Sequence, residues 1–274
     1  MHVRLIPPIS PEGVALPALP HLESLTCEGC AGRYVGICAP LGNNNLASLV
    51  AMGVQRNWAK RQLLYDSESL AQTYYKITQG IVVEFMLLAD GRRQIVAIRT
   101  VGDLCGYPLR KGRYAFTGLA ITPVEACAFG AEKFSAYMGR NVQFACAVAD
   151  HVSERLTQAT IGRTVVGQLR SFERVAHFIL EMEERVRSSG PVELHLTREE
   201  TADYLGLTLE TVSRSFSKLK HMRLISFASA QLVTVLDRKG LREVAWEGLA
   251  KPATDKYRRS SMQPGAPQVA ALPA

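Results

Sequence analysis

The sequence predicts an α+β protein with an N-terminal antiparallel β-roll, a long amphipathic helix and a C-terminal winged helix-turn-helix. Three observations support this prediction. Residues 60–130 alternate in hydrophobicity and are punctuated by glycine, which is typical of short antiparallel strands. Residues 132–160 carry apolar side chains at steps of three and four, as one face of a helix does. Residues 197–225 contain two capped helical patterns separated by a glycine.

Length and composition narrow the class of protein. The chain has 274 residues, which favours two compact domains. Its net charge of +7 and isoelectric point near 9.2 favour a polyanionic partner. No apolar run approaches the roughly 18 residues of a membrane span, and the N-terminus lacks the apolar core of a secretory signal. We therefore expect a cytoplasmic protein, in which disulfides are not the expected use of cysteine.

The N-terminal half begins with a proline-containing stretch at 1–20, which predicts a flexible leader. We expect a cysteine loop and the β-roll to form a sensory domain at 21–131. Within it, apolar spacing predicts a short helix at about 46–58, directly after the loop. Asp90-Gly91 predicts a tight hairpin turn between two of the strands.

The helical stripe at 132–160 leaves two arrangements open. The helix either packs on its own β-roll or pairs with the same helix of a second copy. The stripe consists of Phe134, Tyr137, Met138, Val142, Ala145, Cys146, Ala149, Val152, Leu156 and Ala159. A further amphipathic helix is predicted at 172–187, within a helix-turn-helix domain at 161–247. Residues 248–274 are rich in proline, alanine and serine and predict a disordered tail.

The helix-turn-helix pattern is the most informative part of the chain. Thr197 and Glu200 stand at the spacing of a capping box. The helix that they begin breaks at Gly206, which can take the left-handed conformation that ends a helix. Thr208 then caps a second helix with inward-facing apolar positions. These positions are Leu209, Val212, Phe216, Leu219 and Met222.

The opposite face of the second helix carries the candidate DNA contacts. Glu210, Ser213, Arg214 and Ser217 share one solvent stripe near the helix N-terminus, which is the part of a recognition helix that meets base edges. Arginine can pair bidentately with guanine, and glutamate can accept from cytosine. The alternative is a surface helix on which Glu210 and Arg214 only form an ion pair.

Basic residues and two short strands follow the recognition stripe. The basic side chains suit phosphate contacts, which position a protein on DNA without reading its sequence. They are Lys218, Lys220, His221 and Arg223. Residues 224–228 and 231–236 read as two strands and predict a small wing.

Three of the six cysteines crowd into a glycine-bearing loop as Cys27-x2-Cys30-x7-Cys38. Thiolates at such spacing suit an iron–sulfur cluster or tetrahedral zinc, and spacing alone does not separate the two. Three local ligands leave a fourth to come from elsewhere, with Cys105, Cys127 and Cys146 as candidates. Because Cys146 falls on the apolar stripe, we expect it to be an inert core thiol.

The segment 205–214, with its Glu-x-x-Ser-Arg motif, resembles the DNA-binding helix of the FNR branch of the CRP–FNR transcription regulators. The cysteine spacing is similar to that of FNR-type oxygen sensors of the FnrL and FnrN kind, and the resemblance covers roughly residues 20–245. It implies a homodimer that works with RNA polymerase. It also implies that Glu210, Ser213 and Arg214 contact a TTGAT-type palindrome.

The same resemblance implies a [4Fe–4S] cluster held by Cys27, Cys30, Cys38 and Cys127, with Cys105 as the second choice for the fourth ligand. It further implies that the β-roll is of the cyclic-nucleotide-binding type. The ligand does not carry over, because no Arg-Ser-Ala phosphate cradle follows residues 102–106, although Arg110 and Lys111 there are basic. No cyclic nucleotide is therefore expected.

The expected function is oxygen-dependent control of genes for anaerobic or microaerobic metabolism. The alternatives are a regulator of the same fold that senses nitric oxide or redox state, and one with a structural zinc site. An enzyme is not expected, because the sequence contains neither a nucleophile motif nor a phosphate-cradling glycine loop.

Overall fold

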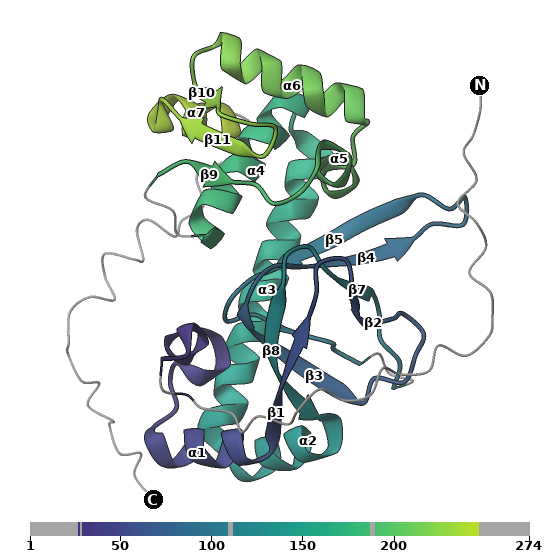
Figure 1. Ribbon diagram of the computed structural model, residues 1–274, viewed down its shortest axis with the longest axis vertical. Coiled ribbons are helices and arrows are strands. Elements are labelled where there is room, and N and C mark those ends of the chain that lie inside the picture. Colours follow the sequence, from purple (N-terminus) through teal and green to yellow (C-terminus); the bar gives the residue numbers. More distant parts are fainter. Residues whose placement is uncertain (1–26, 28, 109–111, 187–189, 247–274) are drawn as a thin grey trace, which may run out of the picture.

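Figure 1 shows the computed structural model, which describes residues 27, 29–108, 112–186 and 190–246. The predicted leader at 1–20 and tail at 248–274 lie outside these residues, as do Arg110 and Lys111. No helix in the described part of the chain is long and apolar enough to cross a membrane.

The chain first forms the cysteine loop and a short helix. Two 3₁₀ turns, η1 (Ala31–Tyr34) and η2 (Gly36–Cys38), lead into helix α1 (Asn43–Ala51). Strand β1 (Gly53–Trp58) follows directly. The helix predicted at 46–58 is therefore wrong in its second half, because that segment pairs along its whole length with a strand distant in sequence, β8 (Val124–Gly130).

The β-roll consists of two antiparallel four-stranded sheets, with strand orders β1-β8-β3-β6 and β2-β7-β4-β5. Its other strands are β2 (Leu63–Tyr65), β3 (Thr73–Gln79), β4 (Val82–Leu87), β5 (Arg93–Arg99), β6 (Leu104–Cys105) and β7 (Thr117–Ala120). The predicted turn at Asp90-Gly91 joins β4 to β5, and Gly91 takes a φ of +82° there. An antiparallel roll is thus confirmed.

Side chains fill the space between the two sheets. Tyr65 stacks on Tyr75 with ring centroids 5.6 Å apart, and its ring lies 4.6 Å from that of Tyr114 at a tilt of 31°. Glu84 is buried beside them, where it accepts a hydrogen bond from Tyr65 and pairs with Arg99. A buried carboxylate is tolerated here because both of its oxygens have a partner.

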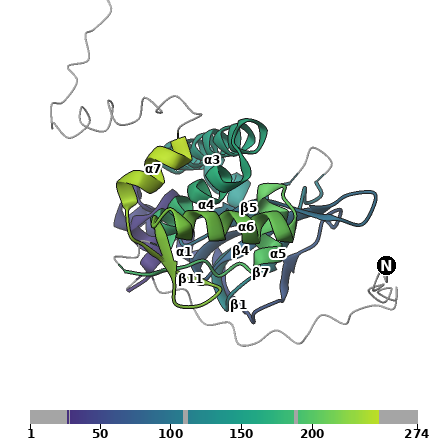
Figure 2. The same cartoon turned by 90° about the horizontal axis from the view of Figure 1, so that it is seen from above.

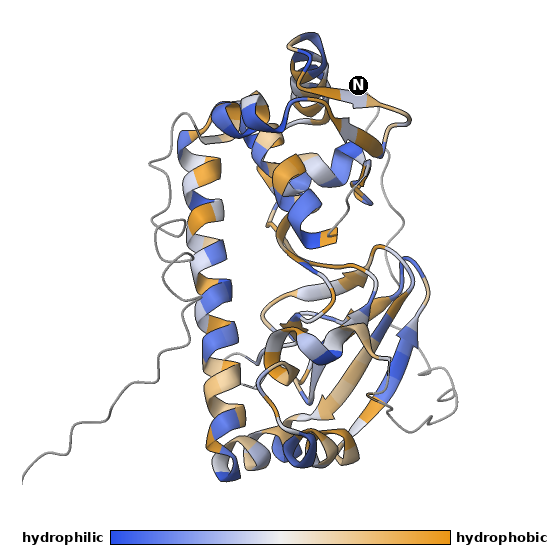
Figure 3. Cartoon of the chain, turned by 90° about the vertical axis from the view of Figure 1, so that its left-hand side faces the viewer, coloured by the Kyte–Doolittle hydropathy of each residue, from blue (hydrophilic) through white to orange (hydrophobic). Residues whose placement is uncertain are grey.

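The helical stretch predicted at 132–160 is two helices, α2 (Ala131–Arg140) and α3 (Val142–Gln168). Asn141 separates them and caps α3, because its side chain accepts a hydrogen bond from the Phe144 amide. Figure 3 shows α3 running along the molecule from the β-roll to the C-terminal domain. The two helices together are therefore longer than the sequence pattern indicated.

The face with which α3 packs is not the predicted stripe. The side chains of α3 that are buried beside the cysteine loop and the roll are Phe144, Ala147, Val148 and His151. The stripe residues Val142, Val152 and Leu156 are 79%, 44% and 67% exposed. The roll is therefore packed by one face of α3, while the α3 part of the predicted apolar stripe is left uncovered in the single chain; its α2 part, with Phe134, is buried.

The C-terminal domain contains α4 (Ser171–Val186), α5 (Arg198–Leu205), α6 (Leu209–His221) and α7 (Arg238–Trp246). A three-stranded sheet has the order β10-β11-β9, with β10 (Ile225–Phe227), β11 (Leu232–Val235) and β9 (Val192–Glu193). The predicted helix at 172–187 and the two wing strands are confirmed. β9 and α7 were not predicted; β9 is two residues long and is fixed by its pairing with β11.

The C-terminal domain contacts the β-roll through α5 and β5, and in the view from above α5 and α6 overlie the strands of the roll (Figure 2). Arg93 of β5 forms an ion pair with Asp203 of α5 at 2.7 Å, and Gln94 donates to the Asp203 carbonyl at 2.6 Å. Arg61 pairs with Glu200 at the start of α5. The helix-turn-helix is thus oriented by the roll through α5.

Candidate DNA interface and cysteine site

The turn between α5 and α6 has the predicted geometry. The Thr197 hydroxyl accepts from the Glu200 amide at 3.1 Å, and the Glu200 carboxylate accepts from the Thr197 amide at 2.9 Å, which completes the capping box. Gly206 ends α5 with a φ of +63°, and Thr208 caps α6. The two helices are therefore joined by a short turn whose backbone groups are satisfied.

The predicted recognition stripe is exposed along α6. Glu210, Ser213, Arg214 and Ser217 all face solvent. Arg214 and Glu210 form an ion pair while both side chains stay mostly exposed. The surface ion pair considered from sequence is thus present. The guanidinium stays exposed, and the pair can open to DNA because exposed ion pairs are weak. Base contacts by this stripe stay a prediction.

Lys218 lies beyond the stripe, and its position is set by a second helix. Its ammonium stands 3.5 Å from the centre of the Phe172 ring at the start of α4. This cation–π contact limits where the charge can lie. Lys220, His221 and Arg223 are exposed in the same region.

The inner face of α6 matches the prediction only in its middle. Val212, Phe216 and Leu219 are buried, whereas Leu209 is 51% and Met222 is 44% exposed. The two end positions were predicted wrongly as core residues, because periodicity specifies a direction on the helix but not where the neighbouring elements stop. Arg198 of α5, which no sequence pattern singled out, lies 3.3 Å above the Phe216 ring. Burial lowers the pKa of Arg198 to about 10.

The cysteine loop is held in shape by an arginine within it. Arg33 donates to the carbonyl oxygens of Cys38 and Leu41 at 2.9 and 3.0 Å. The loop also carries internal turns, in which the Arg33 amide donates to the Cys30 carbonyl. Sequence reasoning missed this role of Arg33, since no pattern identifies which loop cation folds back on its own backbone.

The pairing of the strands decides which distant cysteine faces the loop. Cys127 of β8 lies opposite Lys76 of β3, and side chains paired in this way point to the same face. Cys127, Cys27 and Cys38 pack in one apolar cluster next to α2 and α3. Cys105 lies opposite Tyr75, one residue along β3, and is buried in the other cluster inside the roll.

Burial controls the charge state of these thiols. It raises the pKa of Cys38 and raises that of Cys127 to about 12, with the Lys76 ammonium opposing the effect at both. Burial and the charges of Cys38 and Cys30 raise the pKa of Cys27.

The four thiols do not form a preassembled single-ion site. Within residues 27, 29–108, 112–186 and 190–246, no three His, Cys, Asp or Glu side chains converge closely enough to ligate one metal ion. Zinc–sulfur bonds of about 2.3 Å would require such convergence. Cys146 was predicted wrongly as a core thiol: it is exposed on α3, because the stripe on which it lies is uncovered.

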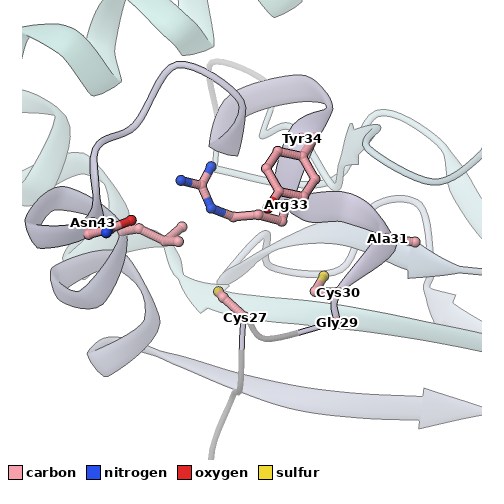
Figure 4. A pocket seen from close by; sticks show the side chains of 8 residues that line it. Cys27, Gly29, Cys30, Ala31, Arg33, Tyr34 and Asn43 are labelled. Atoms are coloured by element: carbon pink, nitrogen blue, oxygen red, sulfur yellow. The ribbon is translucent and has the colours of Figure 1, made fainter.

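A cavity of about 500 Å³ opens beside the loop (Figure 4). Cys27 and Cys30 line it together with Arg33, Tyr34, Asn43 and Leu46. In Figure 4, Arg33 extends across the cavity between Tyr34 and Asn43. Cys38 and Cys127 are not among its lining residues. A small solute can therefore approach the Cys27–Cys30 edge of the site.

Comparison with known proteins adds independent information. Residues 173–244 match a family described as the Crp-like helix-turn-helix domain. The chain is 32% identical to the transcriptional activatory protein AadR of Rhodopseudomonas palustris, over 81% of this chain and 97% of that protein. It is 30% identical to the transcriptional activator protein FnrL of Cereibacter sphaeroides, over 80% of this chain and 91% of that protein. The structure of FixK2 from Bradyrhizobium japonicum superposes with a TM-score of 0.66 at 30% identity, covering 70% of this chain and 96% of that chain.

Proposed function

Since the chain belongs to the CRP–FNR family of DNA-binding transcription regulators, we propose that it senses oxygen through a [4Fe–4S] cluster held by its cysteine site. The observation that supports this proposal is the packing of Cys127 in one apolar cluster with the loop cysteines Cys27 and Cys38. Thiolates are the usual ligands of such clusters. A four-iron cluster is larger than one ion, so its ligands stand further apart than those of zinc.

The donor set fits the cluster, and the cavity supports a sensing role. When bound, the cluster supplies an oxidisable centre that responds to dioxygen. The thiols of Cys27 and Cys30 border the open cavity, which lets a small oxidant approach that edge. Cys38 is buried and Cys127 is half-buried, so these two residues exclude bulk water from the inner edge.

The cysteine loop is connected to α3 by packing and hydrogen bonds. Ile37 and Cys38 belong to the same apolar cluster as Phe144 and Val148 of α3. Gln143 of α3 also donates to the Pro40 carbonyl at 2.7 Å. A displacement of the loop is therefore transmitted to the start of α3.

The uncovered stripe of α3 is where this change acts in our proposal. Val142, Val152 and Leu156 together form an apolar strip that suits pairing with α3 of a second copy. A looser cysteine loop would let α3 shift and would thereby weaken the homodimer. The α3 stripe, rather than the roll, is then the dimer contact.

In the dimer, two α6 helices face successive major grooves of a palindrome. Glu210, Ser213 and Arg214 read a TTGAT-type half-site, while Ser217 and Lys218 contribute at the end of the stripe. Relatives are named for anaerobic regulation and for nitrogen fixation. Genes for anaerobic or microaerobic metabolism are therefore the proposed targets, controlled together with RNA polymerase in the cytoplasm.

The decisive experiment is an absorbance spectrum of anaerobically purified protein, with iron and acid-labile sulfide counted per chain. Single Cys→Ser changes at Cys27, Cys30, Cys38 or Cys127 should abolish the visible absorbance and lose iron. Cys146→Ser is the matched control, because this thiol is exposed on α3.

Other outcomes would redirect the proposal. If Cys105→Ser loses iron while Cys127→Ser keeps it, the assignment of Cys127 as the fourth ligand is wrong. One zinc without sulfide would remove the sensor role. A cluster that survives air but is lost with nitric oxide would make nitric oxide the signal.

A further inference from the structure

Lys76 is a buried lysine that pairs with no carboxylate in the part of the chain that the structure describes. It lies in the middle of β3 and is 1% exposed. Its ammonium donates to the Gly32 carbonyl in the cysteine loop at 2.6 Å. No ion pair among the described residues joins Lys76 to an aspartate or glutamate. One neutral acceptor alone does not offset the cost of burying a positive charge.

Thiols of the cysteine site lie near this ammonium. Lys76 is the direct cross-strand partner of Cys127, and its charge acts on Cys27, Cys38 and Cys127. The ammonium is therefore close to the cysteine site.

The loop is built to admit the ammonium. A Cβ added to Gly32 would lie 2.5 Å from the Lys76 nitrogen and 3.5 Å from the Cys30 sulfur. Gly32 does not adopt a left-handed conformation. The absent side chain at this position thus leaves room for the lysine, and backbone strain gives no other reason for glycine here.

We propose that Lys76 is the built-in counter-charge and anchor of the cysteine site. This proposal deepens the function proposed above, and part of it rests on that function. Four thiolates outweigh the positive charge of an iron–sulfur core, so the bound assembly is anionic and a buried ammonium stabilises it. Without a cluster, the same ammonium ties the loop to β3 through the Gly32 carbonyl.

The anchoring role is tested on cluster-free protein by hydrogen–deuterium exchange of residues 30–38. Lys76→Met keeps the length and apolar stem of the side chain but removes the charge. It should accelerate exchange in this segment several-fold and leave α5 and α6 unchanged. Lys133→Met is the matched control, because Lys133 is an exposed lysine of α2.

Gly32→Ala tests the same contact from the loop side. The added methyl displaces the end of a flexible side chain, so this variant moves the ammonium and keeps its charge. It should also accelerate exchange, and in the double variant with Lys76→Met it should add little. Unchanged exchange in both single variants, or full additivity in the double variant, would overturn the anchoring role.

The counter-charge role is tested on cluster-loaded protein by its reduction potential. A nearby positive charge favours the more negative, reduced cluster, and net charge is one determinant of such potentials. Lys76→Met should shift the potential to more negative values and shorten the lifetime of the visible absorbance in air. A potential equal to that of Lys133→Met, or one shifted upward, would refute this role.

A failure of the proposed function and a failure of the role of Lys76 can be distinguished. If the wild-type protein binds no iron and sulfide, the proposed function fails and the counter-charge role falls with it. The exchange experiment on metal-free protein still decides whether Lys76 anchors the loop. If the cluster is present and neither exchange nor potential responds to Lys76→Met, the proposed function stands and the role of Lys76 is refuted.

Discussion

Replacing Arg214 with alanine isolates base reading from phosphate binding. Arg214 lies on the exposed face of α6, one turn after Glu210, and its guanidinium is engaged only by that carboxylate in the described structure. The substitution removes no buried contact, since the side chain is 77% exposed. Any loss of DNA binding therefore reports a contact to DNA and not a loss of fold.

The magnitude follows from two opposing contributions. A bidentate arginine–guanine contact is worth about 1–3 kcal/mol, hence about 2–6 kcal/mol for the two half-sites of the proposed dimer. The Glu210–Arg214 pair must open first; it is exposed and worth at most about 0.5 kcal/mol in each subunit. The net loss is about 1–5 kcal/mol, which is about fivefold to several thousandfold in affinity.

The assay is a titration of anaerobic protein against a TTGAT-type palindrome and a scrambled duplex at two salt concentrations. Arg214→Ala should lose affinity for the palindrome and largely keep its weak, salt-dependent binding to the scrambled duplex. Lys133→Ala controls for net charge, because α2 lies at the end of the molecule away from α6 (Figure 1). Equal losses on both duplexes would refute the reasoning and assign Arg214 to the backbone.

Three further predictions concern the C-terminal domain. Phe178→Ala should cost about 3–5 kcal/mol in urea unfolding, because the ring is fully buried in the core of the domain; a loss under about 1 kcal/mol would contradict a tightly packed core. Gly206→Ala should cost about 1–2 kcal/mol from its left-handed backbone alone, since the nearest atom, Val166 Cγ1, is 3.6 Å from the added Cβ; an unchanged midpoint would refute this. Burial raises the pKa of Glu200, but hydrogen bonds from Arg61 and from the Thr197 amide outweigh it and hold the pKa below its ordinary value. The carboxylate therefore stabilises the fold above the unfolded pKa, and this stability is lost as pH falls through the folded value. Glu200→Gln should lower stability at pH 7 and flatten the acid branch of the stability curve, whereas an acid branch like that of wild type would exclude the role of Glu200.

The local signals in the sequence were sufficient for the helix-turn-helix. Thr197, Glu200, Gly206 and Thr208 act on backbone groups within four residues of themselves, so their roles can be read without knowing the rest of the fold. The Asp90-Gly91 hairpin is of the same kind. The failures occurred where the partner is distant: residues 53–58 became β1 only because β8 pairs with them.

For the cysteine site, the sequence by itself identified the thiol-rich loop and three candidates for the distant ligand. Only the resemblance to a family selected Cys127 among these candidates. The tertiary structure decided which candidate faces the loop, because strand register places Cys127 toward the loop and Cys105 toward the interior of the roll. The tertiary structure also leaves the apolar stripe of α3, including Cys146, exposed to solvent in the single chain. Lys76 was beyond the reach of sequence reasoning, since a charged residue in a strand is ordinarily exposed and only the packing of the loop over β3 buries it.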